Sequence, residues 1–186
     1  MKTKTKKIKT IFGALTLAVL LFSGCSYRQD GEEVDEKTNE TNETTEQSAQ
    51  VLHIFDGDTF SVRIDGKVET VRALGIDAPE SGAKYTIKEC YSAEATKRAV
   101  ELLGGQEVKL AADPTQADRD KYQRLLRYVY LSDGRFFNKI MIKEGFAREY
   151  TFENKAYQFQ AEFRESQTIA QQNRFGLWGE CEKNTD

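Results

Sequence analysis

The fold is predicted most directly by residues 51–76, which have the sequence VLHIFDGDTFSVRIDGKVETVRALGI. Three β-rich runs, at 51–55, 60–64 and 68–76, are separated by the turn sequences Asp56-Gly57-Asp58 and Asp65-Gly66. β-Branched and aromatic residues favour strands, and Asp-Gly pairs favour the tight turns between neighbouring strands. The stretch therefore predicts a β-meander.

Two more strands and three helices are expected after the meander. The strands are predicted at 106–111 and 125–131, and the helices at 92–103, 136–144 and 154–173. Ser92 is expected to cap the first helix, and the last helix is expected to turn Phe159, Phe163 and Ile169 inward. Five strands with an inserted helix and trailing helices fit an α+β domain built on a small closed barrel.

The first 24 residues have the features of a secretory signal peptide. Lysines are frequent in residues 2–9, and the almost wholly apolar run 11–22 is shorter than the roughly 20 residues that span a bilayer. Residues 21–25, Leu-Phe-Ser-Gly-Cys, resemble the lipobox of bacterial lipoproteins. Cys25 is therefore expected to carry a lipid that anchors the protein to the outer face of the cell membrane, and plain secretion is the alternative.

Residues 25–50 are expected to form the anchor cysteine and a disordered acidic linker. From Ser26 to Gln50, eight acidic residues accompany two basic ones, and apolar side chains are scarce, so this segment cannot bury a core. Residues 51–186 then make up one domain with 20 basic and 22 acidic residues. A generally basic surface is absent, so any recognition of phosphate must be local.

Five charged residues in this domain could together hydrolyse a phosphodiester. They are Asp58, Arg72, Asp77, Glu80 and Arg124. Two carboxylates can hold a hard cation, a third can act as a base, and two guanidinium groups can clamp a phosphate. This constellation makes nuclease activity the leading hypothesis.

The motifs around these residues resemble those of the thermonuclease family, the staphylococcal-nuclease-like calcium-dependent nucleases. The resemblance extends from Val51 to Trp178 and includes, in family order, DGDT at 56–59, RALGIDAPE at 72–80, DKYQR at 120–124 and GLW at 176–178. It implies an OB-fold barrel with three helices, a Ca2+ cofactor, and cleavage of DNA and RNA to products that end in 3′-phosphate. It also leads us to expect a monomer without an obligate protein partner.

The resemblance implies a role for each residue of the reaction centre. The carboxylates of Asp58 and Asp77 and the main-chain carbonyl of Ala78 would bind calcium. Glu80 matches the general base of the family, a carboxylate that either takes the proton of the attacking water directly or mainly orders that water. Arg72 and Arg124 match the two guanidinium groups that bind the scissile phosphate and stabilise the transition state.

The resemblance also implies a substrate-binding surface beside that centre. Lys121 and Tyr122 match residues that contact the neighbouring 5′-phosphate side of the nucleotide, and Tyr150 stands where a tyrosine stacks on the base. Phe152 replaces a second tyrosine and keeps a stacking face. Gln123 stands where the family usually has glycine, so a positive φ at this turn would strain it and could displace Arg124.

The remaining cysteines bear on the compartment. If Cys25 carries lipid, Cys90 and Cys181 are left, and in an exported domain they can pair. Such a disulfide would tie the loop before the first helix to the C-terminal tail.

Other classes of function fit the sequence less well. The single histidine, His53, lies in the first predicted strand outside the motifs, which argues against hydrolases that need a histidine. A noncatalytic OB-fold module that only binds nucleic acid and a surface adhesion domain with structural calcium remain as alternatives. Retention of all five charged residues favours the enzyme.

Overall fold

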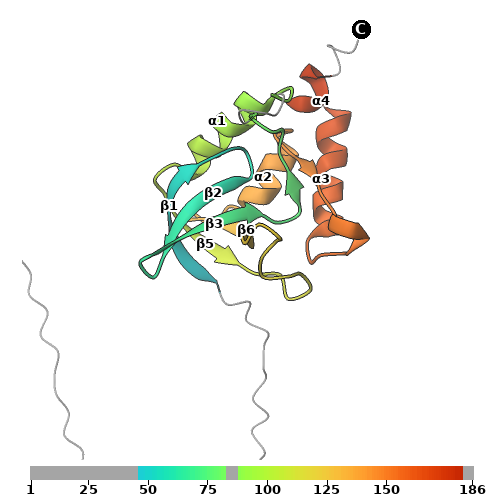
Figure 1. The fold of residues 1–186 in the computed structure, drawn as a ribbon. Helices are drawn as coiled ribbons and strands as arrows, with labels where there is room; N and C mark the ends of the chain where they lie inside the picture. Colours follow the sequence, from blue (N-terminus) through green and yellow to red (C-terminus); the bar gives the residue numbers. More distant parts are fainter. Residues whose placement is uncertain (1–45, 83–87, 182–186) are drawn as a thin grey trace, which may run out of the picture. The chain divides into compact units, whose positions relative to one another are not determined.

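The computed structural model describes residues 46–82 and 88–181, and in these residues five strands form a closed barrel in the order β1-β2-β3-β6-β5. The barrel strands are β1 (Gln47–Ile54), β2 (Thr59–Ile64), β3 (Lys67–Ala73), β5 (Glu107–Ala111) and β6 (Leu125–Leu131). Neighbouring strands are antiparallel except for β3 and β6, which run parallel. The predicted α+β barrel of the OB-fold type is confirmed (Figure 1).

The first strand begins four residues earlier than expected. Its first half, Gln47–Gln50, pairs with β5, and the residues from Gln50 onward pair with β2. This division closes the barrel, and Ala49 is buried inside it. The expectation that residues 47–50 belong to a disordered linker is therefore wrong. The expected signal peptide, Cys25 and the rest of the linker lie outside the described residues.

The third expected strand is divided in two. β3 ends at Ala73, and residues 76–77 form a separate short strand, β4 (Ile76–Asp77), which pairs with β7 (Arg148–Glu149). The turn between β3 and β4 contains Gly75 at a φ of 77°. A Cβ at this glycine would also lie 2.7 Å from the Tyr157 ring, so both the backbone and the packing require glycine here. As a result, Asp77 leaves the barrel sheet.

Three main helices accompany the barrel in the described part of the chain (Figure 1). They are α1 (Ser92–Leu103), α2 (Phe137–Lys143) and α3 (Gln160–Gln172), joined by the short α4 (Leu177–Glu180) and the 3-10 helix η1 (Phe152–Asn154). α1 packs against β1, whereas α2 packs between β6 and α3. No helix of the described residues is long and apolar enough to cross a bilayer.

Helix boundaries and orientation differ from expectation at three places. Ser92 is the first residue of α1 and not its N-cap, a position taken by Tyr91 in the left-handed region with a φ of 69°. α3 begins at Gln160, six residues later than expected, because Asn154 ends η1 and residues 155–159 form an irregular segment. Phe163 is buried as predicted, but Ile169 is exposed.

The core joins the inner face of the barrel to the apolar faces of the helices. Phe60 and Val71 of the barrel, Leu103 of α1 and Phe137 of α2 are fully buried in one cluster, and the rings of Phe60 and Phe137 meet edge to face. Burial of an aromatic or aliphatic side chain of this size stabilises a fold by roughly 1.5–3 kcal/mol. This core supports the ends of β2, β3 and β6, where the charged motif residues lie.

Candidate active site

Three neighbouring strands bring the central charged residues together. Thr59 at the start of β2 pairs with Arg72 of β3, and Arg72 pairs in turn with Leu126 of β6. Asp58 immediately precedes β2, and Arg124 immediately precedes β6. The register of the barrel therefore places these three charged residues beside one another.

Arg72 is the centre of the cluster. Its Nε lies 3.1 Å from Oδ1 of Asp58, and its Nη2 donates to Oδ1 of Asp77 at 2.9 Å. Its Nη1 donates to the carbonyl oxygens of Ala73 at 2.9 Å and Ile76 at 2.6 Å. One guanidinium therefore bridges both carboxylates. The Arg72 side chain is only 14 % exposed, so little solvent reaches these ion pairs.

Asp58 is a buried carboxylate, with 4 % of the residue exposed. Its Oδ1 accepts the hydroxyl proton of Thr59 at 2.9 Å, and its Oδ2 accepts the N–H of Ala78 at 2.6 Å. Burial raises the pKa of Asp58 to about 7, although Arg72 lowers it, and the charge of Asp56 raises it further. The surrounding protein therefore does not fully compensate the negative charge of this buried carboxylate.

The turn before β2 is shaped by two residues that the motif analysis did not assign to the site. Oδ1 of Asp56 accepts the N–H groups of Asp58 at 3.0 Å and Thr59 at 2.7 Å, which is an Asx-type turn. A Cβ at Gly57 would lie 2.6 Å from Cβ of Ala78, so glycine allows the turn to pack directly on that residue. The Asp-Gly sequence was the available signal for this role.

The loop before β6 holds Arg124. Oδ2 of Asp120 accepts from Nε of Arg124 at 2.7 Å, and Oδ1 accepts the N–H groups of Arg124 at 3.0 Å and Tyr122 at 2.9 Å. Burial acts to raise the pKa of Asp120, but the N–H and guanidinium of Arg124 lower it below its usual value. Nη1 of Arg124 lies 3.5 Å from Oγ1 of Thr59, which links this loop to Asp58. Asp120, which the DKYQR motif includes but to which no role was assigned from the sequence, is therefore the residue that orients Arg124.

Gln123 has the backbone conformation that was expected to be costly. Its φ is 67°, and its N–H donates to the carbonyl of Asp120 at 3.0 Å. Arg124 nevertheless stays within reach of Thr59, because Asp120 binds it through both its backbone and its side chain. The strain at Gln123 therefore does not displace Arg124 from the cluster.

Glu80 lies just after β4 at the exposed edge of the cluster. Partial desolvation of its carboxyl group and the charge of Asp56 raise the pKa of Glu80, while Arg72 opposes the rise and Asp77 adds to it. The carboxylate is therefore close enough to respond to the charges of the cluster. Its main chain is bound by Glu89, which the sequence analysis also missed.

The aromatic residues expected to bind substrate are both exposed. Tyr122 is 67 % exposed, and Nζ of Lys121 and Cζ of Arg124 lie 5.0 Å and 5.3 Å from its ring centroid. Tyr150 is exposed and its N–H donates to the carbonyl of Gly75 at 3.0 Å. Tyr122 thus adjoins Arg124, whereas Tyr150 is tied to the turn that precedes β4.

The cluster offers oxygen ligands that suit a hard cation. Asp58 and Asp77 are bridged by one guanidinium, and Ala78 contacts Asp58 through its N–H. Among the described residues, no group donates a hydrogen bond to the Ala78 carbonyl oxygen. The described part of the chain has no cluster of three or more His, Cys, Asp or Glu side chains placed to share a metal. A cation held here would therefore keep water molecules in its coordination shell.

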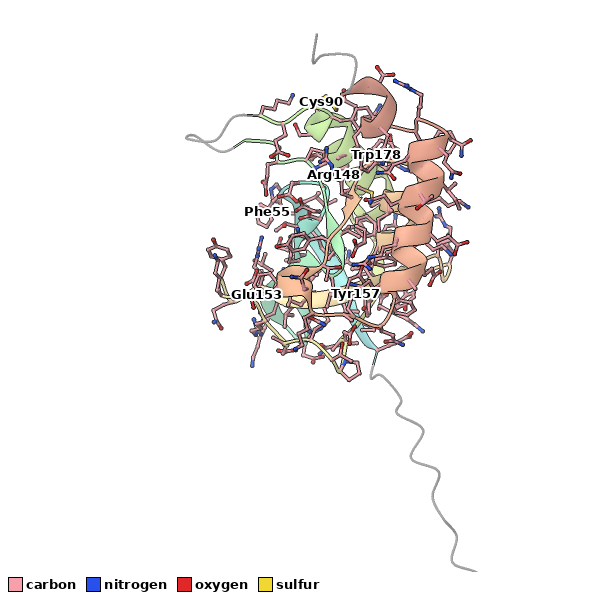
Figure 2. All side chains as sticks on the ribbon, turned by 90° about the vertical axis from the view of Figure 1, so that its right-hand side faces the viewer. Phe55, Cys90, Arg148, Glu153, Tyr157 and Trp178 are labelled. Carbon is pink, nitrogen blue, oxygen red and sulfur yellow. A yellow bond between two sulfur atoms is a disulfide. The ribbon has the colours of Figure 1, made fainter. Side chains whose placement is uncertain are left out.

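The remaining predicted residues lie away from the cluster. Cys90 and Cys181 form a disulfide with a Cα–Cα distance of 5.8 Å, and Cys90 lies toward the same end of the domain as Trp178 of α4 (Figure 2). His53 is an exposed residue of β1 whose ring packs edge to face on Phe55 at 4.8 Å. Neither belongs to the charged cluster.

Comparison with known proteins gives a consistent result. Residues 70–180 match a family model described as staphylococcal nuclease homologue. The chain is 34 % identical over 132 residues to a thermonuclease of Staphylococcus hyicus, covering 71 % of this chain and 76 % of that protein. It is 32 % identical over 174 residues to a thermonuclease of Staphylococcus intermedius, covering 93 % and 98 %. It is 36 % identical over 124 residues to Endonuclease YncB of Bacillus subtilis (strain 168), covering 66 % and 57 %.

Proposed function

Because this chain belongs to the staphylococcal nuclease family, we propose that it is an exported, calcium-dependent nuclease that hydrolyses phosphodiester bonds of DNA and RNA. The names of its relatives, thermonuclease and endonuclease, support the nuclease class. The observation that carries the proposal is the meeting of Asp58 and Asp77 on Arg72, with Arg124 linked to Asp58 through Thr59.

Asp58, Asp77 and the carbonyl of Ala78 would hold the calcium ion. The raised pKa of Asp58 supports this assignment, because a buried carboxylate short of positive charge gains from a cation. When bound, the ion supplies Lewis-acid stabilisation of negative charge on a phosphate oxygen. Asp77, with 49 % of its side chain exposed, keeps this corner open to solvent and substrate.

Arg72 and Arg124 bind the scissile phosphate. Negative charge grows on the equatorial oxygens of phosphorus during attack, so fixed guanidinium donors stabilise the transition state more than the ground state. In the structure, Nη2 of Arg72 donates to Asp77 and Nε of Arg124 donates to Asp120. These carboxylates hold the two guanidinium groups in place before the substrate binds. The two side chains therefore need little rearrangement to reach the transition state.

Glu80 positions the water that attacks phosphorus. The raised pKa of Glu80 makes its carboxylate a stronger base. As the water oxygen bonds to phosphorus, it gives up a proton to the Glu80 carboxylate. The P–O5′ bond breaks, and O5′ takes up a proton from solvent and leaves as a hydroxyl. The products would then carry 3′-phosphate and 5′-hydroxyl ends.

The exposed aromatic residues and the N-terminus complete the proposal. Tyr122 and Tyr150 offer faces on which bases can stack, and Lys121 adds a positive charge beside them. Residues 1–24 direct export, and Cys25 anchors the protein to the outer face of the membrane through its lipid. The enzyme acts as a monomer.

Digestion of labelled single-stranded DNA and RNA by the full chain tests this function. We expect cleavage in calcium, none in chelator, and products that a polymerase extends only after a 3′-phosphatase has acted. Glu80→Gln serves as the inactive control, because it keeps the side-chain shape and removes the base. Binding to nucleic acid without any cleavage would instead support a noncatalytic OB-fold module.

A further inference from the structure

Among the residues that the structure describes, Glu89 alone holds the main chain of Glu80. The N–H of Glu80 donates to Oε2 of Glu89 at 3.2 Å, and the carbonyl of Glu80 accepts the N–H of Glu89 at 3.0 Å. Glu80 lies outside the strands, and no other hydrogen bond to its backbone occurs among the described residues. Its orientation toward the cluster therefore depends on where Glu89 is fixed.

Glu89 is fixed from the side of α1 and the C-terminus. Its carbonyl accepts the N–H of Ser92, the first residue of α1, at 3.3 Å. The next residue, Cys90, is bound covalently to Cys181. The residue after that, Tyr91, stacks on Phe146 with ring centroids 5.6 Å apart.

The C-terminal side of this disulfide is itself anchored. The N–H of Cys181 donates to the carbonyl of Leu177 at 3.1 Å, and the N–H of Leu177 donates to the carbonyl of Gly145 at 2.9 Å. A Cβ at Gly176 would lie 2.2 Å from the carbonyl oxygen of Gly145, so the two backbones pack directly on each other. A chain of fixed contacts thus connects the end of α2, α4, the disulfide and Glu89.

We infer that Glu89, fixed by the Cys90–Cys181 disulfide, is a positioning residue for Glu80. This inference rests on the proposed nuclease function, in which Glu80 positions the attacking water. Glu89 does not touch the reacting atoms. It keeps the main chain of Glu80 in place through two hydrogen bonds. The Glu89 side chain accepts the N–H of Glu80, and the Glu89 N–H donates to the carbonyl of Glu80.

Paired variants of Glu89 test the side-chain contact. Glu89→Met has similar length and no acceptor oxygen, whereas Glu89→Gln keeps an acceptor and loses the charge. We expect Glu89→Met to lower kcat by up to about a hundredfold, the cost of displacing a reacting group by about 1 Å. Glu89→Gln should restore kcat to within a few-fold of wild type. KM and the calcium concentration for half-maximal activity should change little in both.

A matched control separates positioning from charge. Glu94→Met removes the same charge from an exposed position in the first turn of α1. We expect this variant to have the same kcat as the wild type. Circular dichroism should show that all three variants are folded. A Glu89→Met variant that is folded and has wild-type kcat overturns the inference.

The disulfide is tested by the double variant Cys90→Ser with Cys181→Ser, assayed in calcium well below its melting temperature. We expect a loss of kcat without a comparable rise in KM. Adding Glu89→Met to this double variant should then lower kcat by a smaller factor than it does in the wild type, because both changes act on the same contact. A lower melting temperature with unchanged kcat would show that the disulfide only stabilises the fold, and would overturn its part in positioning. If the wild type itself does not cleave, the proposed function fails as well. A wild type that cleaves, together with folded variants whose kcat is unchanged, overturns the inference alone.

Discussion

Arg72 contacts four acceptors at once, namely two carboxylates and two backbone carbonyls. A carboxylate without this guanidinium would be costly to bury at the position of Asp58, since removal of one partner of a buried ion pair costs roughly 3–5 kcal/mol. Arg72 therefore serves both the fold and the proposed chemistry, and its replacement would not separate the two. Arg124, which is more exposed, allows a cleaner test.

Arg124→Ala should lower kcat by roughly 10²–10³, the cost of removing one donor to transition-state charge. The fold should survive, because the contacts of the side chain are an ion pair with Asp120, a 3.5 Å contact to Thr59 and a cation–π contact with the exposed Tyr122 ring. Arg135→Ala is the matched control, because Arg135 binds Asp133 through its N–H and its Nε in the same pattern. Steady-state kinetics that showed equal loss in both variants would contradict the role of Arg124.

Gln123→Gly should stabilise the protein without harming activity. A residue other than glycine in the left-handed region costs roughly 1–2 kcal/mol, and the greater freedom of glycine in the unfolded chain offsets about 0.5–1 kcal/mol. The net gain in the free energy of unfolding should be between about 0 and 1.5 kcal/mol, measurable by urea unfolding. Gly134→Gln, at an exposed turn with a φ of 83°, should show the reverse.

At the scale of elements, strands with strong local signals were predicted well. The DGDT turn and the run 125–131 were located correctly, because their turn residues and β-branched or aromatic side chains agree with the tertiary structure. Residues 47–50 were missed because their composition is polar, and they form a strand only by pairing with β5 across the barrel. Such a pairing is set by tertiary contacts, which local pattern does not reveal.

The sequence predicted which residues form the site, but not the hydrogen bonds that hold them in place. The motifs identified Asp58, Arg72 and Asp77, which the structure brings into direct contact. The supporting roles of Asp120, which begins the DKYQR motif, and of Glu89, which lies outside the motifs, depend on side-chain geometry in loops. They could be found only once the loops were placed in space.

Asp113 joins three elements of the domain. Its Oδ1 accepts the N–H and hydroxyl of Thr115, and its Oδ2 accepts the hydroxyl of Tyr128 at 2.6 Å and the N–H of Gln158 at 2.8 Å. These bonds connect the loop after β5 to β6 and to the segment before α3. Burial acts to raise the pKa of Asp113, but the hydrogen bonds from these residues hold it below its usual value.

Asp113→Asn should therefore lower the free energy of unfolding at pH 7 by about 2–3 kcal/mol, since buried donors lose their charged acceptor. The folded-state pKa lies below the unfolded value of roughly 4, so this stabilisation is complete above about pH 4 and is lost as pH falls through the folded-state pKa. Urea unfolding from pH 7 to acid should show the difference between wild type and variant shrinking in that window. A difference that stays constant with pH would contradict this account.

For the whole molecule, export and anchoring are proposed from the N-terminal sequence. Cys25→Ala should move the protein from the membrane fraction into the medium without lowering its specific activity, because the substituted residue lies far along the chain from the motif residues. Cell fractionation with an activity assay measures both quantities. A wild-type protein found wholly in the medium would contradict lipid anchoring and support plain secretion.

The central claim is that a cation is held by Asp58 and Asp77 beside the two phosphate-binding arginines. Its most direct test is the rate of cleavage of single-stranded DNA as a function of free calcium, measured for wild type and for Asp58→Asn. We predict no cleavage by the wild type in chelator, a saturable rise with calcium, and a curve for Asp58→Asn that is shifted to much higher calcium and reaches a lower maximum. Full activity in chelator, or the same calcium curve for both proteins, would contradict the claim.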